Sequence, residues 1–315
     1  MSAAKGQKEN IGFVFDLDGV IYHSGGKGKA VVPRTAEALT LLEKHNIPYA
    51  FVSNGTGYTE LQKAQLIEKL LSKECSIKVP REKVFLSATP MRELAIKYGN
   101  QRVLVVAGDT KSLEKGTAAR VATDLGFKNF VTIEDFTARR PHLLPLTDVQ
   151  TSEELMAGKS NEPIAACFVF HEPPSWHETL QVLIDVIGCG GQVEQLEPGA
   201  SRTARTEKVG EEEPSFDVYL TNPDIMYPVQ NAPPRFTLGS FGLCLGAMYQ
   251  RLSTLRPGFC APLNIHYCGK PFPMVYKSAR KYLEAAAAER DQQTEPVKMD
   301  AIFMVGGEWP HLVTF

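Results

Sequence analysis

The chain has 315 residues, 43% of them hydrophobic and 22% charged, and its formal net charge at pH 7 is −2. A chain of this length forms one large domain or two smaller ones, and its near-neutral charge excludes the basic surface of a nucleic-acid binder or of a polybasic membrane anchor. No apolar run approaches the ~20 residues of a membrane span, so we expect small-molecule partners, no nucleic acid and no membrane span.

The residues before the first predicted strand contain neither the apolar centre of a signal peptide nor an Arg-rich presequence. The six cysteines include no CxxC pair and lie mostly in apolar segments, which favours a reducing compartment. We therefore expect an intracellular protein, cytoplasmic or mitochondrial.

Strands and helices are predicted to alternate from the first strand onward. The segment GFVFDLDGVIY (12–22) is typical of a buried strand that ends in a turn, and PRTAEALTLLEKHN (33–46) places apolar residues on one helical face. IPYAFVSNGTG (47–57) repeats the strand and the turn, and TELQKAQLIEKLLSKE (59–74) supplies the next helix. This alternation predicts a parallel sheet.

The middle of the chain is predicted to form an α/β unit of its own. It begins with the strand RVLVVAGD (102–109), continues through the strand and helix of IAACFVFHEPPSWHETLQVLIDVIGC (164–189), and reaches a polar loop at about 190–214. The remaining predicted elements are, in order, FDVYLTNPD (216–224), a helix in FTLGSFGLCLGAMYQRLS (236–253), a strand in NIHYCGKP (264–271), a helix in PMVYKSARKYLEAAAAERDQQ (273–293) and a strand in MDAIFMVGG (299–307).

Polar side chains follow three of the predicted strands. Asp16 and Asp18 come after FVF, Ser53 and Asn54 come after AFV, and Lys270 comes after IHYCG. In an open parallel sheet the ligand site lies beyond the carboxyl ends of the strands, where these side chains would meet. Each signal alone is also typical of a helix cap, a turn or a loop.

Taken together and in this order, these residues resemble the motifs of the haloacid dehalogenase superfamily, in its phosphatase-like subclass IIA. DLDGV (16–20) is similar to the first motif, Ser53 to the second and Lys270, in GKP, to the third. The chain also resembles the group of the cat-eye-syndrome-region protein and its fungal mitochondrial relatives, through GFKNFVTIEDF (126–136) among other segments.

The resemblance implies an α/β fold with a doubly wound parallel, Rossmann-like core and a large inserted α/β cap domain. We expect the core to comprise residues 1–87 and 236–315, with the cap at 88–235 between them. In such an arrangement the cap covers the site and selects the substrate.

The resemblance also assigns roles to the two acids. Asp16 would attack a phosphoryl group and form an aspartyl-phosphate, which divides one difficult displacement into two easier ones. Asp18 would protonate the leaving oxygen and later take a proton from the hydrolytic water. Both acids reach the site only if the turn directs them there, which Gly19 would permit.

A hard cation is needed because the nucleophile and the phosphate are both anionic. Mg²⁺ would bind the carboxylate of Asp16 and the backbone carbonyl of Asp18. The residues expected to hold the phosphoryl oxygens are Ser53, Asn54, Gly55 and Lys270.

Three other segments have more than one interpretation. TNPD, Thr221–Asp224, is either a plain Asn-Pro turn or the returning segment of the cap that faces the substrate. VAGDT after a strand lacks a GxGxxG pattern, so Asp109 or Thr110 is expected to cap a helix. HEPPSWH (171–177) brings two histidines near a glutamate, but its prolines forbid the HExxH helix of zinc enzymes.

The pattern of the family breaks at its fourth motif. After AIFMV the family has Gly-Asp-Asn-Pro, whose Asp completes the metal site, whereas this chain has VGGEWPHLVTF with Gly307 at that position. Loss of a metal ligand predicts a poor or inactive phosphatase. Codons for residues 307–309 can contain GTGAGT, the start of a eukaryotic intron, so we hypothesise a C-terminal truncation at this motif; a genuine short isoform or degenerate paralogue is the alternative.

The leading prediction is therefore Mg²⁺-dependent hydrolysis of a small phosphomonoester. The alternative is an impaired or truncated member that binds a phosphorylated metabolite or a protein without turnover. The sequence leaves the oligomeric state open.

Overall fold

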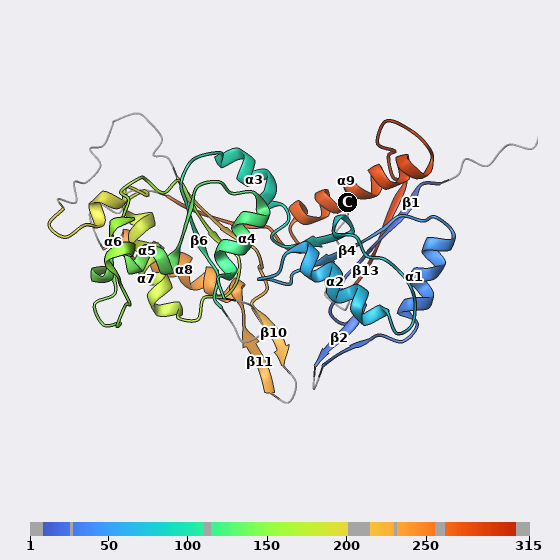
Figure 1. Cartoon of the computed structure of the whole chain (residues 1–315), viewed down its shortest axis with the longest axis horizontal. Coiled ribbons are helices and arrows are strands. Elements are labelled where there is room, and N and C mark those ends of the chain that lie inside the picture. Colours follow the sequence, from blue (N-terminus) through green and yellow to red (C-terminus); the bar gives the residue numbers. More distant parts are fainter. Residues whose placement is uncertain are drawn as a thin grey trace, which may run out of the picture.

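The structure, a computed structural model, describes residues 9–25, 28–109, 115–200, 215–229, 232–255 and 262–306. It contains two parallel sheets, each covered by helices on both faces (Figure 1). The predicted α/β class with a doubly wound core is therefore confirmed. Within the described residues, no helix is both long and apolar enough to cross a membrane.

The first sheet has the strand order β13-β1-β4-β5, with all neighbours parallel. Successive residues of β1 and β4 face opposite sides, as the two-residue period of a strand requires. One side packs on α1 and α2 and the other on α9. The elements are β1 (Ile11–Phe15), β4 (Tyr49–Ser53), β5 (Val84–Leu86), β13 (Ala301–Val305), α1 (Thr35–Lys44), α2 (Glu60–Leu71) and α9 (Pro273–Arg290).

The second sheet has the strand order β12-β9-β8-β6-β7 and is also parallel. Helices α3 and α4 cover one face, and α5, α7 and α8 cover the other. The elements are β6 (Val103–Val106), β7 (Phe130–Thr132), β8 (Ala166–Val169), β9 (Phe216–Leu220), β12 (Leu263–Tyr267), α3 (Met91–Tyr98), α4 (Thr117–Leu125), α5 (Ile133–Ala138), α6 (Glu153–Ala157), α7 (Trp176–Gly188) and α8 (Leu238–Ser253).

Two hairpins project on the same side of the molecule (Figure 1). One belongs to the first sheet's half and consists of β2 (Tyr22–Gly25) and β3 (Gly28–Val31). The other consists of β10 (Met226–Val229) and β11 (Ala232–Phe236), and most of its side chains are exposed.

The structure differs from the predicted boundary at residue 235. Helix α8 and strand β12, which the sequence assigned to the second part of the core, belong to the second sheet: β12 pairs with β9, and Phe241 and Leu245 of α8 lie in its apolar cluster. The chain returns to the first sheet only after β12, with α9. The apolar pattern of α8 predicts a buried face but carries no information about which sheet buries it.

The two connections between the sheets lie side by side. The chain leaves the first sheet after β5 and returns after β12. A Cβ atom built on Gly269, in the returning connection, would lie 3.0 Å from Cβ of Ser87 in the outgoing one and 2.7 Å from the Thr221 carbonyl oxygen. Both connections therefore pass through one crowded point.

A network of charged side chains also joins the two halves. Glu60 of α2 is 5% exposed and accepts hydrogen bonds from Arg81 and from Arg92 of α3. Both arginines also reach Asp124 of α4. A buried carboxylate needs such partners, so this network ties α2 to the helices of the second sheet.

Two glycines of α8 test whether this helix packs on the second sheet. A Cβ on Gly242 would meet Tyr267 Oη at 2.4 Å and Leu220 Cδ2 at 2.9 Å, whereas a Cβ on Gly246 would meet only Ile265 Cδ1, at 3.4 Å. We expect Gly242→Ala to lower the free energy of unfolding by about 1–3 kcal/mol through overpacking. The control Gly246→Ala should raise it by about 0.5–1 kcal/mol because alanine favours the helix. Urea unfolding of both variants measures these changes; equal effects would contradict the packing.

Candidate active site

Asp16 follows the last residue of β1 and is held by backbone contacts on both sides. Its N–H donates to the carbonyl of Val305 at the end of β13 (2.9 Å), and its Oδ1 accepts from the N–H of Leu17 (2.7 Å). The chain then turns sharply: Gly19 has φ +85°, and its N–H donates to the Tyr22 carbonyl (2.8 Å). Gly19 therefore adopts a left-handed conformation, which glycine accepts without strain, and Asp18 is exposed.

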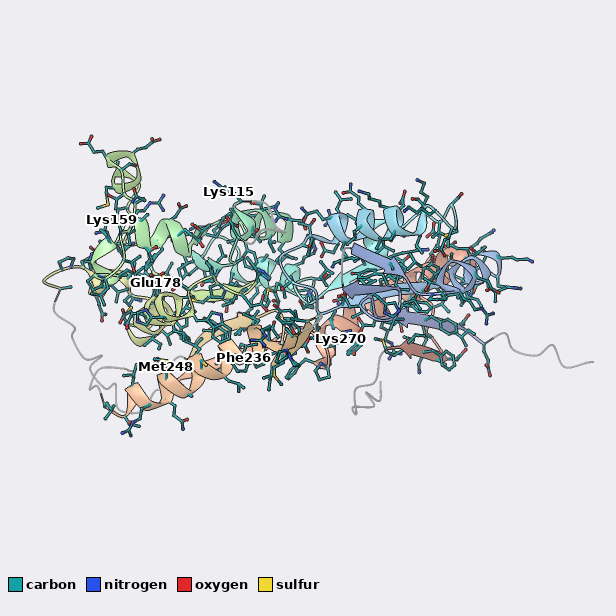
Figure 2. All side chains as sticks on the ribbon, turned by 90° about the horizontal axis from the view of Figure 1, so that it is seen from below. Lys115, Lys159, Glu178, Phe236, Met248 and Lys270 are labelled. Atoms are coloured by element: carbon teal, nitrogen blue, oxygen red, sulfur yellow. The ribbon has the colours of Figure 1, made fainter. Side chains whose placement is uncertain are left out.

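Lys270 reaches Asp16 from the connection that follows β12. Its Nζ lies 2.7 Å from Asp16 Oδ1, and the two side chains are 16% and 20% exposed. Figure 2 shows Lys270 where the two halves of the molecule meet. Both contacts of the Asp16 carboxylate in the described part of the chain involve Oδ1, so Oδ2 is the oxygen available to a ligand.

Asn54, directly after β4, fixes the position of Lys270. The side-chain oxygen of Asn54 accepts from the Lys270 N–H (2.7 Å), and its amide nitrogen donates to the Lys270 carbonyl (2.9 Å). The same amide nitrogen lies 3.1 and 3.2 Å from the two carboxylate oxygens of Asp224. The side chain of Asn54, for which the sequence predicted no role, therefore positions the lysine.

The TNPD segment forms a turn, and it is not the returning connection, since the chain returns to the first sheet only after β12. The Asp224 N–H donates to Oδ1 of Asn222 (2.8 Å), a side-chain turn that fixes the segment. The Asp224 carboxylate faces Asn54 at the site. Burial raises the pKa of Asp224 above its ordinary value, and the negative charge of Asp16 adds to the effect, while the hydrogen bond from Asn54 and the charge of Lys270 oppose it.

Ser53, the last residue of β4, and Gly55 contact each other at the start of the loop that follows. Ser53 is 2% exposed, and its hydroxyl oxygen accepts from the Gly55 N–H (3.0 Å). Lys270 thus contacts both Asp16 and Asn54. Ser53 and Gly55 are the chain neighbours of Asn54. Gly307 lies outside the described residues.

Two contacts at the site were not predicted from the sequence. Nδ1 of His171, after β8, lies 2.6 Å from Oγ1 of Thr56 in the first half and 2.8 Å from Oε2 of Glu172. The other oxygen of Glu172 accepts from the Thr237 hydroxyl and from the N–H of Leu238 (3.0 Å), so the Glu172 carboxylate caps the start of α8. The sequence HEPP has no motif that indicates contacts with residues so distant in the chain.

The predicted cap Asp109 is confirmed, since its carboxylate accepts from two N–H groups at the start of α4. Thr110, the other candidate for this cap, lies outside the described residues.

The environment of Glu172 makes its charge important for stability. Burial alone would raise the pKa of Glu172, but hydrogen bonding and charge from His171, with the Thr237 hydroxyl, outweigh burial and lower the pKa to about 2. A depressed carboxyl pKa stabilises the folded state above the unfolded pKa, about 4.5, and this stabilisation is lost as the pH falls towards 2.

We expect Glu172→Gln to lower the free energy of unfolding at pH 7 by on the order of 2–3 kcal/mol, because the depressed pKa reflects that much favourable interaction. The difference from the parent should shrink between pH 4.5 and pH 2. The control Glu93→Gln removes an exposed carboxylate whose partner Lys281 is also exposed, and should have no measurable effect. Denaturant unfolding across this pH range is the measurement, and a pH-independent loss would contradict the assignment.

The metal-binding capacity of the site rests on oxygen atoms. Among the described residues, no group of three or more His, Cys, Asp and Glu side chains is arranged to hold a metal ion. Oδ2 of Asp16 and the carbonyl of Asp18 are hard oxygen donors beside the site, and Mg²⁺ commonly takes one or two protein carboxylates with water as the remaining ligands. The donor set is therefore compatible with a hard divalent cation.

Comparison with known proteins identifies relatives of the whole chain. The family model for haloacid dehalogenase-like hydrolases matches residues 13–128. A mitochondrial hydrolase of Saccharomyces cerevisiae is 28% identical over 87% of this chain and 70% of its own length. A cardiolipin synthase (CMP-forming) / mitochondrial hydrolase fusion protein of Schizosaccharomyces pombe is 29% identical over 97% of this chain, which spans 46% of the fusion protein.

Solved structures with the same fold include a mutant thermostable NPPase from Geobacillus stearothermophilus, with TM-score 0.53, 16% identity and coverage of 96% of this chain and 81% of that one. A protein of Cytophaga hutchinsonii described as a possible sugar phosphatase of the HAD superfamily has TM-score 0.52 and 16% identity, and covers 94% of this chain and 77% of its own. The resemblance of the motifs is thus confirmed by the match of residues 13–128 to the haloacid dehalogenase-like hydrolases and by the similarity to the fungal hydrolase, and the solved structures share the fold.

Proposed function

We propose that this protein is a Mg²⁺-dependent phosphatase that hydrolyses a small phosphomonoester through an aspartyl-phosphate on Asp16. The observation that carries the proposal is the Asp16–Lys270 contact of 2.7 Å, which engages Oδ1 and leaves Oδ2 available at the end of β1. A carboxylate oriented by an ammonium group is a suitable nucleophile for phosphorus.

The two carboxylates divide the chemistry between them. Oδ2 of Asp16 attacks the phosphorus atom, and Asp18 protonates the departing ester oxygen. Asp18 then accepts a proton from the water molecule that hydrolyses the aspartyl-phosphate. The turn at Gly19, with φ +85°, supports this division because it closes on Leu17, between the two acids, through the hydrogen bond from the Tyr22 N–H to the Leu17 carbonyl.

The groups around the nucleophile stabilise the negative charge that develops on the phosphoryl oxygens. The Lys270 ammonium supplies positive charge, and the Ser53 hydroxyl and the N–H of Gly55 supply hydrogen bonds once a ligand replaces their mutual contact. Asn54 acts as a positioning residue because its side chain holds both backbone groups of Lys270. Preorganised donors of this kind need no rearrangement during the reaction.

The carboxylate of Asp16 and the backbone carbonyl of Asp18 would hold Mg²⁺. The ion would reduce the repulsion between the anionic nucleophile and the anionic phosphate. The half that contains the second sheet supplies the substrate contacts, since Asp224 and His171 already reach the first half from it. The location of the protein, in the cytoplasm or the mitochondrion, stays a prediction. The Saccharomyces relative is described as mitochondrial.

A second candidate function is binding of a phosphorylated ligand without turnover. The observation that favours it is the glycine at position 307, where the family has a further metal-binding carboxylate. The Val305 carbonyl accepts from the Asp16 N–H, so the chain that follows β13 starts beside the nucleophile. Without that carboxylate, weak Mg²⁺ binding and slow turnover are expected.

The phosphatase proposal predicts a covalent intermediate. With Mg²⁺ and a ³²P-labelled aryl phosphate, acid quenching should trap label on the parent chain, and Asp16→Asn should trap none because the amide is not a nucleophile. Asp18→Asn should slow phosphate release by at least about 100-fold, the usual contribution of a general acid and base. Lys69→Met, an exposed change on α2, serves as the control. Label on the Asp16→Asn chain would refute the assignment of the nucleophile.

The alternative is tested by restoring the missing carboxylate. We expect Gly307→Asp to increase phosphate release and Mg²⁺ affinity by at least about tenfold, the lower end of the losses that follow damage around metal ligands. Gly306→Asp, one residue earlier, is the matched control and should not increase either quantity. If Gly307→Asp has no effect while the parent still binds phosphate, the binding function is the better account.

A further inference from the structure

Lys63 is a buried cation that the proposed mechanism does not use. It lies on α2 and is only 2% exposed. Its Nζ lies 4.5 Å from the centre of the Tyr58 ring, a favourable but modest contact. Among the residues that the structure describes, no carboxylate lies within ion-pair distance of this ammonium group. Lysine is almost never buried to this extent without a partner, because an unpaired charge is costly in a protein interior.

The ammonium group of Lys63 faces the loop that follows β4. A Cβ atom built on Gly55 would lie 3.2 Å from Lys63 Nζ and 3.2 Å from Ser53 Oγ. The lysine and the serine hydroxyl therefore flank the same side of Gly55. Gly55 has no side chain, and this lets both groups approach the backbone of the loop.

The charged groups around Lys63 come from several elements. Asp18, in the turn after β1, attracts its charge, and Lys29 of β3 repels it. Tyr58 lies beside it before α2, and Lys29 stands over the Tyr22 ring at 4.3 Å. Lys29 and Lys63 therefore both lie near Asp18, and Lys270 contacts Asp16. The positive charge of these lysines suits an anion.

We propose that Lys63 is a further anion-binding residue, whose ammonium group binds an oxygen of the substrate's phosphoryl group together with Ser53 and Lys270. The inference rests on the proposed function, because it places this group in the same phosphoryl pocket. Lys63 thereby differs from Lys270, which contacts the nucleophile itself. An arriving dianion would form a charge-assisted contact with this buried ammonium group.

The charge of Lys63 should make anion binding depend on pH. Burial lowers the pKa of Lys63 to about 8, and the repulsion from Lys29 acts in the same direction, while Asp18 opposes both. An anion prefers the protonated amine, so affinity is full below this pKa and falls as the pH rises through it.

Sulfate is the probe, because it is a tetrahedral dianion whose own charge does not change between pH 7 and pH 9.5. Binding is measured by titration calorimetry on the full chain in excess Mg²⁺, at both pH values. Three Lys→Met variants are compared: Lys63→Met, Lys270→Met as the test of the proposed site, and the exposed Lys69→Met on the same helix as the matched control. Thermal unfolding reports whether each variant is folded.

We expect Lys63→Met to weaken sulfate binding at pH 7 by at least about tenfold, as loss of one partner of a buried charge pair does. Its melting temperature should not fall, because the change removes a buried charge. The parent should lose affinity between pH 7 and pH 9.5, and Lys63→Met should lose less. Lys69→Met should match the parent throughout.

Unchanged sulfate affinity in folded Lys63→Met, with weakened affinity in Lys270→Met, would overturn this inference and leave the proposed function standing. If the parent binds no sulfate, this inference and the proposed function are both overturned. The same holds if the Lys63→Met and Lys270→Met variants both bind sulfate as tightly as the parent. A lower melting temperature in Lys63→Met with parental affinity would assign Lys63 a purely structural role.

Discussion

The contact between Lys270 and Asp16 determines how the site is built. It joins the end of β1 to the connection after β12, two segments that are far apart in the sequence and come from different sheets. Asn54 holds the backbone of that lysine, so the ammonium is fixed by more than its own flexible side chain. The turn at Gly19, the loop after β4 and the return from the second sheet must all be in place for this one contact to form.

Charge balance around the nucleophile follows from the same arrangement. Asp16, Asp18 and Asp224 bring negative charge to the site, and Lys29, Lys63 and Lys270 bring positive charge. Burial penalises both kinds of charge, which explains why the pKa of Asp224 is raised and that of Lys63 is lowered. A dianionic ligand and a divalent cation are complementary to such a mixed environment.

Much of the fold and part of the site could be predicted because their signals are local. The alternation of apolar runs and amphipathic segments indicated the strands and helices, and acids directly after a strand indicated the site at the carboxyl ends. The assignment of α8 and β12 to the second sheet could not be predicted, since an apolar face does not specify its partner. The contact of His171 with Thr56 and the burial of Lys63 also depend on tertiary packing: Lys63 follows an ordinary helical pattern, and only the folded chain places its amine beside Gly55.

The crowding at Gly269 has a consequence for motion. Because the outgoing and returning connections touch at Ser87 and Gly269, any rotation of one half against the other has its axis close to that point. Lys270 is the next residue along the chain, so Asp16 and Lys270 lie near the axis, where displacements are small. Outlying parts such as α6 lie farther from it and would move most (Figure 1). A hinge movement about this point would therefore leave the contact between Asp16 and Lys270 nearly unchanged.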